Sequence, residues 1–260
     1  MSHRIGIVAE ADADGRTISI LVDHVICESN PPDWIDVGNI DDYRTYCGLD
    51  DSAMLLRWQD VDKPHRGLVL PIRADRKTLK SPDAFSAYRV LINFARLPSN
   101  RRVDAVILVR DADHQPERRS GLEQARNTLL ASPHNQNGGF RVVIAFANTK
   151  RECWHICGFE PAEHEQQLLE ELRSGTDGLG FDPRIESHQL TASNDHANDK
   201  RSVKRVLDHL TGGNCIREFA CLDSSLSLLH ERGTQNGLND FLNEIESIIL
   251  PMFGGLPDRI

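Results

Sequence analysis

The sequence predicts an α/β protein with a mostly parallel central sheet and helices on both faces. Short apolar blocks alternate with amphipathic stretches through the first 150 residues. The block Val103–Val109 is nearly continuous in its apolar character, as expected of a strand buried on both faces. Acids follow two of these blocks: Glu10 comes after the first, and Asp111 and Asp113 come after a later one. Strand, helix, strand, helix at such spacing is typical of βαβ units.

The apolar blocks predict strands at residues 4–9, 67–72, 103–109 and 141–147. The apolar stripes between them predict helices at residues 15–26, 81–95 and 116–130. Ser81 and Pro82 support the second helix start, because serine caps a helix and proline fits its first turn. Residues 28–66 lack a long apolar period. We interpret them as an insertion or long loop with one helix at about Tyr43–Trp58.

The last third of the chain is predicted to be mainly helical. Its amphipathic stretches lie at about residues 152–158, 161–172, 200–210, 224–231 and 238–249. Residues 175–196 are rich in Gly, Asp, Ser and Asn and predict a loop. We therefore expect an α/β core at residues 1–150, with its insertion at about 28–66, and a helical extension at 151–260 that packs on the core.

Composition narrows the classes of function. The chain of 260 residues carries 39 acidic and 30 basic residues, a net charge of −9, which argues against a broad, non-specific grip on nucleic-acid phosphates. It leaves room for local basic strips such as Arg101 with Arg102, Arg118 with Arg119, and residues 200–205. The sequence contains no apolar segment of membrane-spanning length and no signal peptide, so we expect a cytoplasmic protein without a membrane partner.

The acids after the strands predict a metal site. Two carboxylates as close as Asp111 and Asp113 repel each other unless a cation or a proton lies between them. Open parallel sheets bind ligands at the carboxyl ends of their strands. On an extended exit the two aspartates point to opposite sides, so one binds metal directly and the other acts through water or on a second ion. The plainer interpretation is that Asp113 caps the helix that starts near Pro116.

The same residues resemble the TOPRIM fold of topoisomerases, bacterial primases and overcoming-lysogenization-defect nucleases. Glu10 matches the glutamate of that family, and Asp111-Ala112-Asp113 matches its Asp-x-Asp pair. Ala11 is a departure, since the family often has glycine there. The chain is also similar to uncharacterised bacterial TOPRIM-like proteins found beside an ATPase in phage-defence settings. Glu152 and Trp154, the basic stretch at 199–204 and the final amphipathic helix carry that likeness.

The resemblance implies Mg²⁺- or Mn²⁺-dependent cleavage of DNA or RNA phosphodiesters, with an ATPase partner and a role in antiviral defence. Glu10, Asp111 and Asp113 are the implied catalytic and metal-binding acids. Asp14 and Glu152 are implied as further metal ligands. Lys200, or alternatively Lys204, would stabilise charge that develops on the phosphate. A homodimer is expected only because such assemblies are common.

Two other functions stay open on the sequence alone. A nucleotide-sugar transferase also uses Asp-x-Asp at a strand end to hold a metal on a diphosphate, although that class has no role for Glu10. A TOPRIM-derived binding or scaffold subunit would need no catalysis, and Ala11 together with the net acidity favours it.

Overall fold

The chain divides into two compact units in the computed structural model. Unit 1 contains Met1–Arg110, Pro116–Ala145 and Asn243–Ile260, and unit 2 contains Asp111–Gln115 and Phe146–Leu242. The predicted boundary near residue 150 stays a prediction. The structure describes residues 2–29, 31–50, 52–61, 63, 79–133, 135, 139–174, 178–191 and 199–254.

A mostly parallel sheet confirms the predicted α/β class. Its strand order is β2-β1-β4-β5, and β3 also pairs with β1. The apolar side chains of β1 and β4 are fully buried, which matches strands covered on both faces. The strands are β1 (His3–Ala9), β2 (Arg44–Cys47), β3 (Leu56–Arg57), β4 (Ala105–Asp111) and β5 (Arg141–Ala147).

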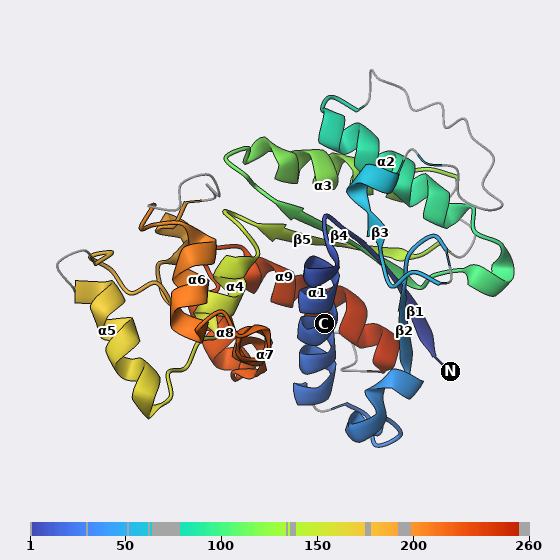
Figure 1. Cartoon of the computed structure of the whole chain (residues 1–260). Coiled ribbons are helices and arrows are strands. Elements are labelled where there is room, and N and C mark those ends of the chain that lie inside the picture. Colours follow the sequence, from blue (N-terminus) through green and yellow to red (C-terminus); the bar gives the residue numbers. More distant parts are fainter. Residues whose placement is uncertain are drawn as a thin grey trace. The chain divides into compact units, whose positions relative to one another are not determined.

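Helices of unit 1 cover both faces of the sheet. The helices α2 (Pro82–Ala95) and α3 (Glu117–Leu130) lie side by side on one face, and α1 (Asp12–Glu28) lies on the other (Figure 1). Ser81 caps α2 as predicted, since its hydroxyl accepts the N–H of Ala84 at 3.1 Å. All three helices agree with the sequence prediction to within a few residues.

The helix predicted at Tyr43–Trp58 is wrong. That segment instead contains β2 and β3, which both pair in parallel with β1. Arg44 and Tyr46, on β2, bind the carboxylate of Asp23 in α1, with Arg44 Nε and Tyr46 Oη each 2.8 Å from Asp23 Oδ1. These long-range contacts outweigh local propensity. Short 3₁₀ turns flank the strands at Val37–Asp42 and Trp58–Asp60. The strand predicted at residues 67–72 lies outside the described residues.

Unit 2 is mainly helical, which confirms the prediction for the C-terminal region. Trp154 is fully buried and stacks on Phe241, with ring centroids 5.4 Å apart. A helix at Cys215–Ala220 was not expected, because six residues are too few to show a period. The helices of unit 2 are α4 (Glu152–Cys157), α5 (Gln166–Ser174), α6 (Val203–Thr211), α7 (Cys215–Ala220) and α8 (Leu226–Arg232). The helix α9 (Leu238–Glu244) begins in unit 2 and passes into unit 1 at Asn243, where it continues as a π-helix over Ile245–Ile249.

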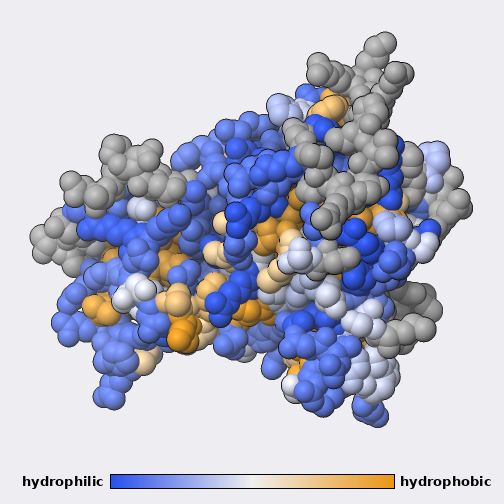
Figure 2. Space-filling model, turned by 45° about the vertical axis from the view of Figure 1, so that its right-hand side comes forward, coloured by the Kyte–Doolittle hydropathy of each residue, from blue (hydrophilic) through white to orange (hydrophobic). Residues whose placement is uncertain are grey.

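The visible surface is mostly hydrophilic, with apolar residues in small groups (Figure 2). Within the described ranges, every helix is too short or too polar to cross a membrane. All six cysteines are free thiols, and Cys153 and Cys157 of α4 are buried.

Candidate functional site

The strand ends that carry the predicted acids belong to neighbouring strands. The two strands pair in parallel with Val8 beside Leu108, so continuing the register brings Glu10 level with Arg110. Arg110 donates to Glu10 Oε1 at 2.7 Å and lies 3.2 Å from Asp83 Oδ1. Its guanidinium also covers the ring of Trp58 at 4.9 Å. In unit 1 the charge of Glu10 is therefore balanced by an arginine that sequence reasoning did not single out.

The chain turns sharply after Asp111, so the extended exit expected there is wrong. Asp113 and His114 have φ angles of 43° and 64°. Both lie in the left-handed region, which non-glycine residues seldom adopt. The N–H of Gln115 donates to the carbonyl of Ala112 at 2.7 Å and closes the turn. Such strain tends to occur where a side chain must be held in one place.

The aspartates on this turn bind the segment that follows β5. Asp111 Oδ1 accepts the backbone N–H of Arg151 at 3.1 Å, and Asp113 Oδ1 lies 3.1 Å from Lys150 Nζ. The helix α3 begins with Pro116 at its N-cap position. Asp113 therefore binds a lysine rather than occupying the helix cap.

Lys150 is the common partner of three predicted acids. Burial by itself lowers the pKa of Lys150, but the hydrogen bond with Asp113 and the charges of Asp111 and Glu152 raise it above its ordinary value. We call Asp111, Asp113, Lys150 and Glu152 the Lys150 site, and all four belong to unit 2. Sequence reasoning missed Lys150, although it stands only two residues before Glu152.

Further cations surround Glu152, which is itself buried. Glu152 Oε1 lies 3.8 Å from an Arg151 nitrogen and 3.7 Å from Lys204 Nζ. Arg151 is held in turn by His155, whose Nε2 lies 2.8 Å from Arg151 Nη1. Lys204, the alternative to Lys200 in the sequence analysis, is thus the lysine that contacts a site acid. Lys200 lines a cavity beside α6.

Asp14 has a local structural contact. Its Oδ2 accepts the N–H of Ala11 at 2.8 Å and so closes the first turn of α1. An acid in this turn also favours the helix dipole. Asp14 belongs to unit 1, and its predicted part in metal binding stays a prediction.

The acids that the sequence predicts as metal ligands at the Lys150 site are bound to protein groups in this structure. Among the residues that the structure describes, three or more acids, histidines or cysteines are nowhere placed to hold one metal ion. Mg²⁺ keeps several waters and binds through one or two carboxylates together with substrate phosphates. Asp111 and Asp113 supply such oxygen ligands, and the acids of the site already act together on one cation, the ammonium of Lys150.

Comparison with protein-family models, with curated proteins and with solved structures finds no match for this chain. The functional conclusion therefore depends on the chemistry of the site and on the motifs that resemble TOPRIM.

Proposed function

We propose that this protein is a Mg²⁺- or Mn²⁺-dependent phosphodiester hydrolase that acts on nucleic acid through the Lys150 site. The observation that carries the proposal is the set of three carboxylates acting on one half-buried ammonium. The site begins at Asp111, the last residue of β4, and an open α/β sheet commonly binds its ligand at this end of its strands. The TOPRIM-like motifs support the same chemistry.

Each residue of the Lys150 site has a different role in the proposed reaction. Asp111 and Asp113 would hold the metal, which stabilises charge on the attacking and leaving oxygens when it is bound. Lys150, whose pKa is raised, stays protonated at neutral pH and donates to a non-bridging phosphate oxygen. Asp113 positions that ammonium, and Lys204 balances Glu152. Glu10, in unit 1, pairs with Arg110, and its catalytic part stays a prediction from the sequence.

The resemblance extends the proposal to the biological setting. Proteins of the similar TOPRIM-like group stand beside an ATPase in phage-defence settings. We therefore propose a cytoplasmic defence effector that works with a separate ATPase chain.

A second candidate is a non-catalytic binding or scaffold subunit. The observation that favours it is the pairing of Glu10 with Arg110, of Asp113 with Lys150, and of Glu152 with Lys204. Ion pairs of this kind can be purely structural. Isothermal calorimetry separates the two candidates, because an active site should bind Mg²⁺ or Mn²⁺ at millimolar concentration and a scaffold should not.

Cleavage assays test the first proposal directly. Supercoiled plasmid, single-stranded DNA and tRNA are incubated with the protein in Mg²⁺, in Mn²⁺ and in a chelator. We expect cleavage that needs metal and that the double variant D111N/D113N abolishes while its circular dichroism stays native. The matched control is Asp223→Asn, which neutralises an exposed acid elsewhere in unit 2. Unchanged cleavage by D111N/D113N contradicts the proposal.

A further inference from the structure

A cavity of about 180 Å³ lies in unit 2 between α5 and α6. Its size is well below the roughly 300 Å³ at which pockets begin to hold drug-sized ligands. It therefore suits a single ring rather than a whole dinucleotide cofactor. The cavity is lined by Leu172, Leu179, Lys200, Arg205, Val206 and His209.

The lining separates into an apolar floor and a basic rim. Leu179 and Val206 are buried, whereas Lys200, Arg205 and His209 are exposed. Arg205 and His209 stand four residues apart on α6 and so share one face of that helix. Every charged or titratable side chain in the described lining is basic, although the chain as a whole carries a net charge of −9.

A further cation stands next to Lys200 in the chain, together with the carboxylate of Asp199, which accepts the Arg201 N–H at 3.0 Å. Arg201 follows Lys200 directly, and its guanidinium lies 5.7 Å from the centre of the Phe181 ring. An apolar hollow with three basic side chains in its lining complements a ligand that has a flat ring joined to repeated negative charges. A single nucleic-acid strand has this chemistry, since each base is a ring and each link carries a phosphate.

We infer that this cavity accepts one unstacked base of a single-stranded polynucleotide, whose flanking phosphates lie on Arg205 and Lys200. The inference rests on the proposed function and narrows its substrate class to single strands. Bases in a duplex are stacked and paired, so one of them could enter only after it had been flipped out at a cost of a few kcal/mol.

Fluorescence anisotropy tests this inference on the full chain in a chelator, which prevents cleavage. The probes are a labelled oligothymidine, an abasic strand of equal length and phosphate number, and a duplex. We expect the oligothymidine to bind best. Arg205→Ala should weaken the binding of oligothymidine roughly fivefold at about 0.1 M salt. One phosphate contact on a single strand changes log K by about 0.7 for each tenfold change in salt, which is about fivefold between 1 M and 0.1 M. The slope of log K against the logarithm of the salt concentration should become shallower by about 0.7, the value for one phosphate contact.

The control is Arg141→Ala, which removes the same charge from an exposed arginine of unit 1 and should leave binding unchanged. Equal binding of the abasic strand overturns the inference, because the base would then make no contribution. Unaltered binding by R205A, full displacement by polyglutamate at equal charge, or failure of the oligothymidine to bind also overturns it.

The experiments distinguish an error in the inferred base binding from an error in the proposed hydrolase function. The D111N/D113N variant should keep the preference for oligothymidine over the abasic strand while losing cleavage. Metal-dependent cleavage without base-dependent binding refutes only the inferred binding of a base in the cavity. Base-dependent binding by a chain that cleaves nothing refutes the hydrolase alone.

Discussion

Lys150 allows three carboxylates to lie near one another in unit 2. Like-charged carboxylates such as Asp111, Asp113 and Glu152 repel each other unless a cation compensates their charge. The lysine supplies that cation from the segment that follows β5, and Asp113 contacts it at 3.1 Å. In the proposed hydrolase the same ammonium meets the substrate phosphate, so one residue serves both stability and function.

His155 is a buried histidine that stays neutral. Burial, and then the charge of Arg151, lower its pKa to about 3. The ring accepts from Arg151 at Nε2, and its Nδ1–H donates to the carbonyl of Glu218 at 2.9 Å. This pair of contacts requires the neutral ring with its proton on Nδ1. A proton on Nε2 would face the guanidinium of Arg151, so acid should weaken this part of unit 2.

We predict that His155 makes folding stability depend on pH. Its pKa is about 3 in the folded chain and near 6.5 when unfolded, so the unfolded chain binds more protons between these values. Stability is then complete above about pH 6.5 and falls on acidification, by up to about 1.4 kcal/mol per pH unit. Urea denaturation between about pH 5 and pH 6.5 measures this slope. His155→Gln, which keeps an acceptor for Arg151, should flatten it.

Glu165 offers a check on that prediction, because it acts in a different pH range. The hydrogen bond from Arg217 lowers the pKa of Glu165 to about 2, so its contribution is lost only as the pH falls from about 4.5. An H155Q variant that keeps the full native slope above pH 5 would show that His155 is not the titrating group.

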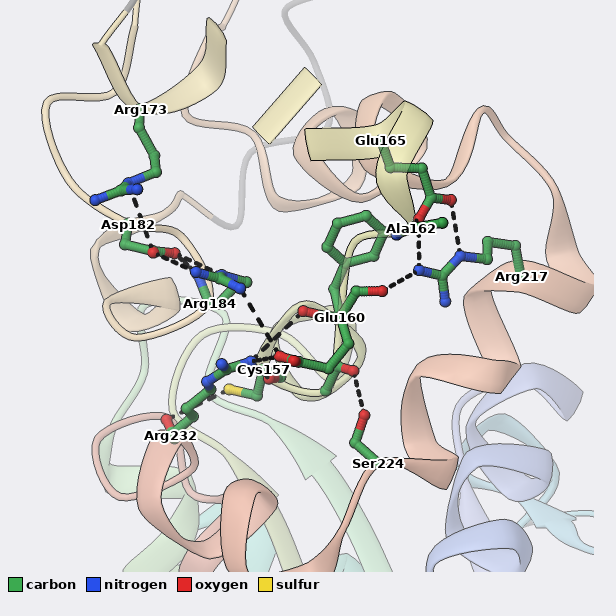
Figure 3. Close-up of polar contacts among 12 residues, drawn as sticks. Cys157, Glu160, Ala162, Glu165, Arg173, Asp182, Arg184, Arg217, Ser224 and Arg232 are labelled. Atoms are coloured by element: carbon green, nitrogen blue, oxygen red, sulfur yellow. Dashed lines mark hydrogen bonds and ion pairs between the residues drawn. The ribbon is translucent and has the colours of Figure 1, made fainter. Parts of the chain in front are cut away.

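At the scale of the element, arginines from distant helices close the C-terminal end of α4 (Figure 3). Arg232 donates to the carbonyl of Cys157 at 3.1 Å and to Glu160 Oε1 at 2.6 Å. Arg217 donates to the carbonyl of Glu160 at 2.6 Å. The last carbonyls of a helix lack partners within the helix, and cations also complement its negative end. These contacts tie α8 to α4, and α7 to the segment that follows α4.

The turn before α9 requires glycine. Gly237 has φ near 90°, and a Cβ built on it would lie 2.1 Å from the carbonyl oxygen of Phe146. We predict that Gly237→Ala destabilises the protein by about 2–4 kcal/mol, since left-handed strain adds to a backbone clash. Gly212→Ala is the matched control, because Gly212 also has a positive φ but a Cβ there would meet no atom within 4 Å. It should cost only about 1–2 kcal/mol. Equal losses in thermal denaturation would refute the clash.

At the scale of the whole molecule, the C-terminal segment returns to unit 1 after the long excursion through unit 2. Glu244 accepts the backbone N–H of Ile144 at 2.7 Å and pairs with Arg126 at 2.7 Å. Ile144 lies in β5, which stands at the end of the order β2-β1-β4-β5 among the strands that the structure describes. Exposed edge strands invite pairing with other chains. Glu244 thus covers part of this edge in the folded chain.

We predict that Glu244→Ala lowers the free energy of unfolding by about 2–4 kcal/mol, because it leaves a buried N–H and a half-buried arginine without this acceptor. Glu244→Gln keeps an acceptor oxygen and should cost less. Urea denaturation measures the loss, and light scattering measures the association expected when the edge is exposed. Equal stability of the alanine, glutamine and native chains would contradict this role.

Sequence patterns determined those features of the protein that depend on local order along the chain. The predicted strand at residues 141–147 coincides with β5, and Ser81 caps α2 as expected. Hydrophobic periodicity and capping act over a few residues, so they can be read directly. The α/β class followed from the alternation of such segments. The pattern also indicated that acids follow β1 and β4.

Tertiary structure decided everything that depends on residues far apart in the chain. The segment at Arg44–Arg57 forms two strands because its backbone pairs with β1 and its Tyr46 side chain binds Asp23 of α1. Glu10 acquired Arg110 from a hundred residues away, and the turn at Asp113 delivered that acid to Lys150. Pairings of this kind depend on the balance of burial, charge and backbone geometry in the folded state. Local sequence patterns therefore predict where acids follow strands but not which cations those acids meet.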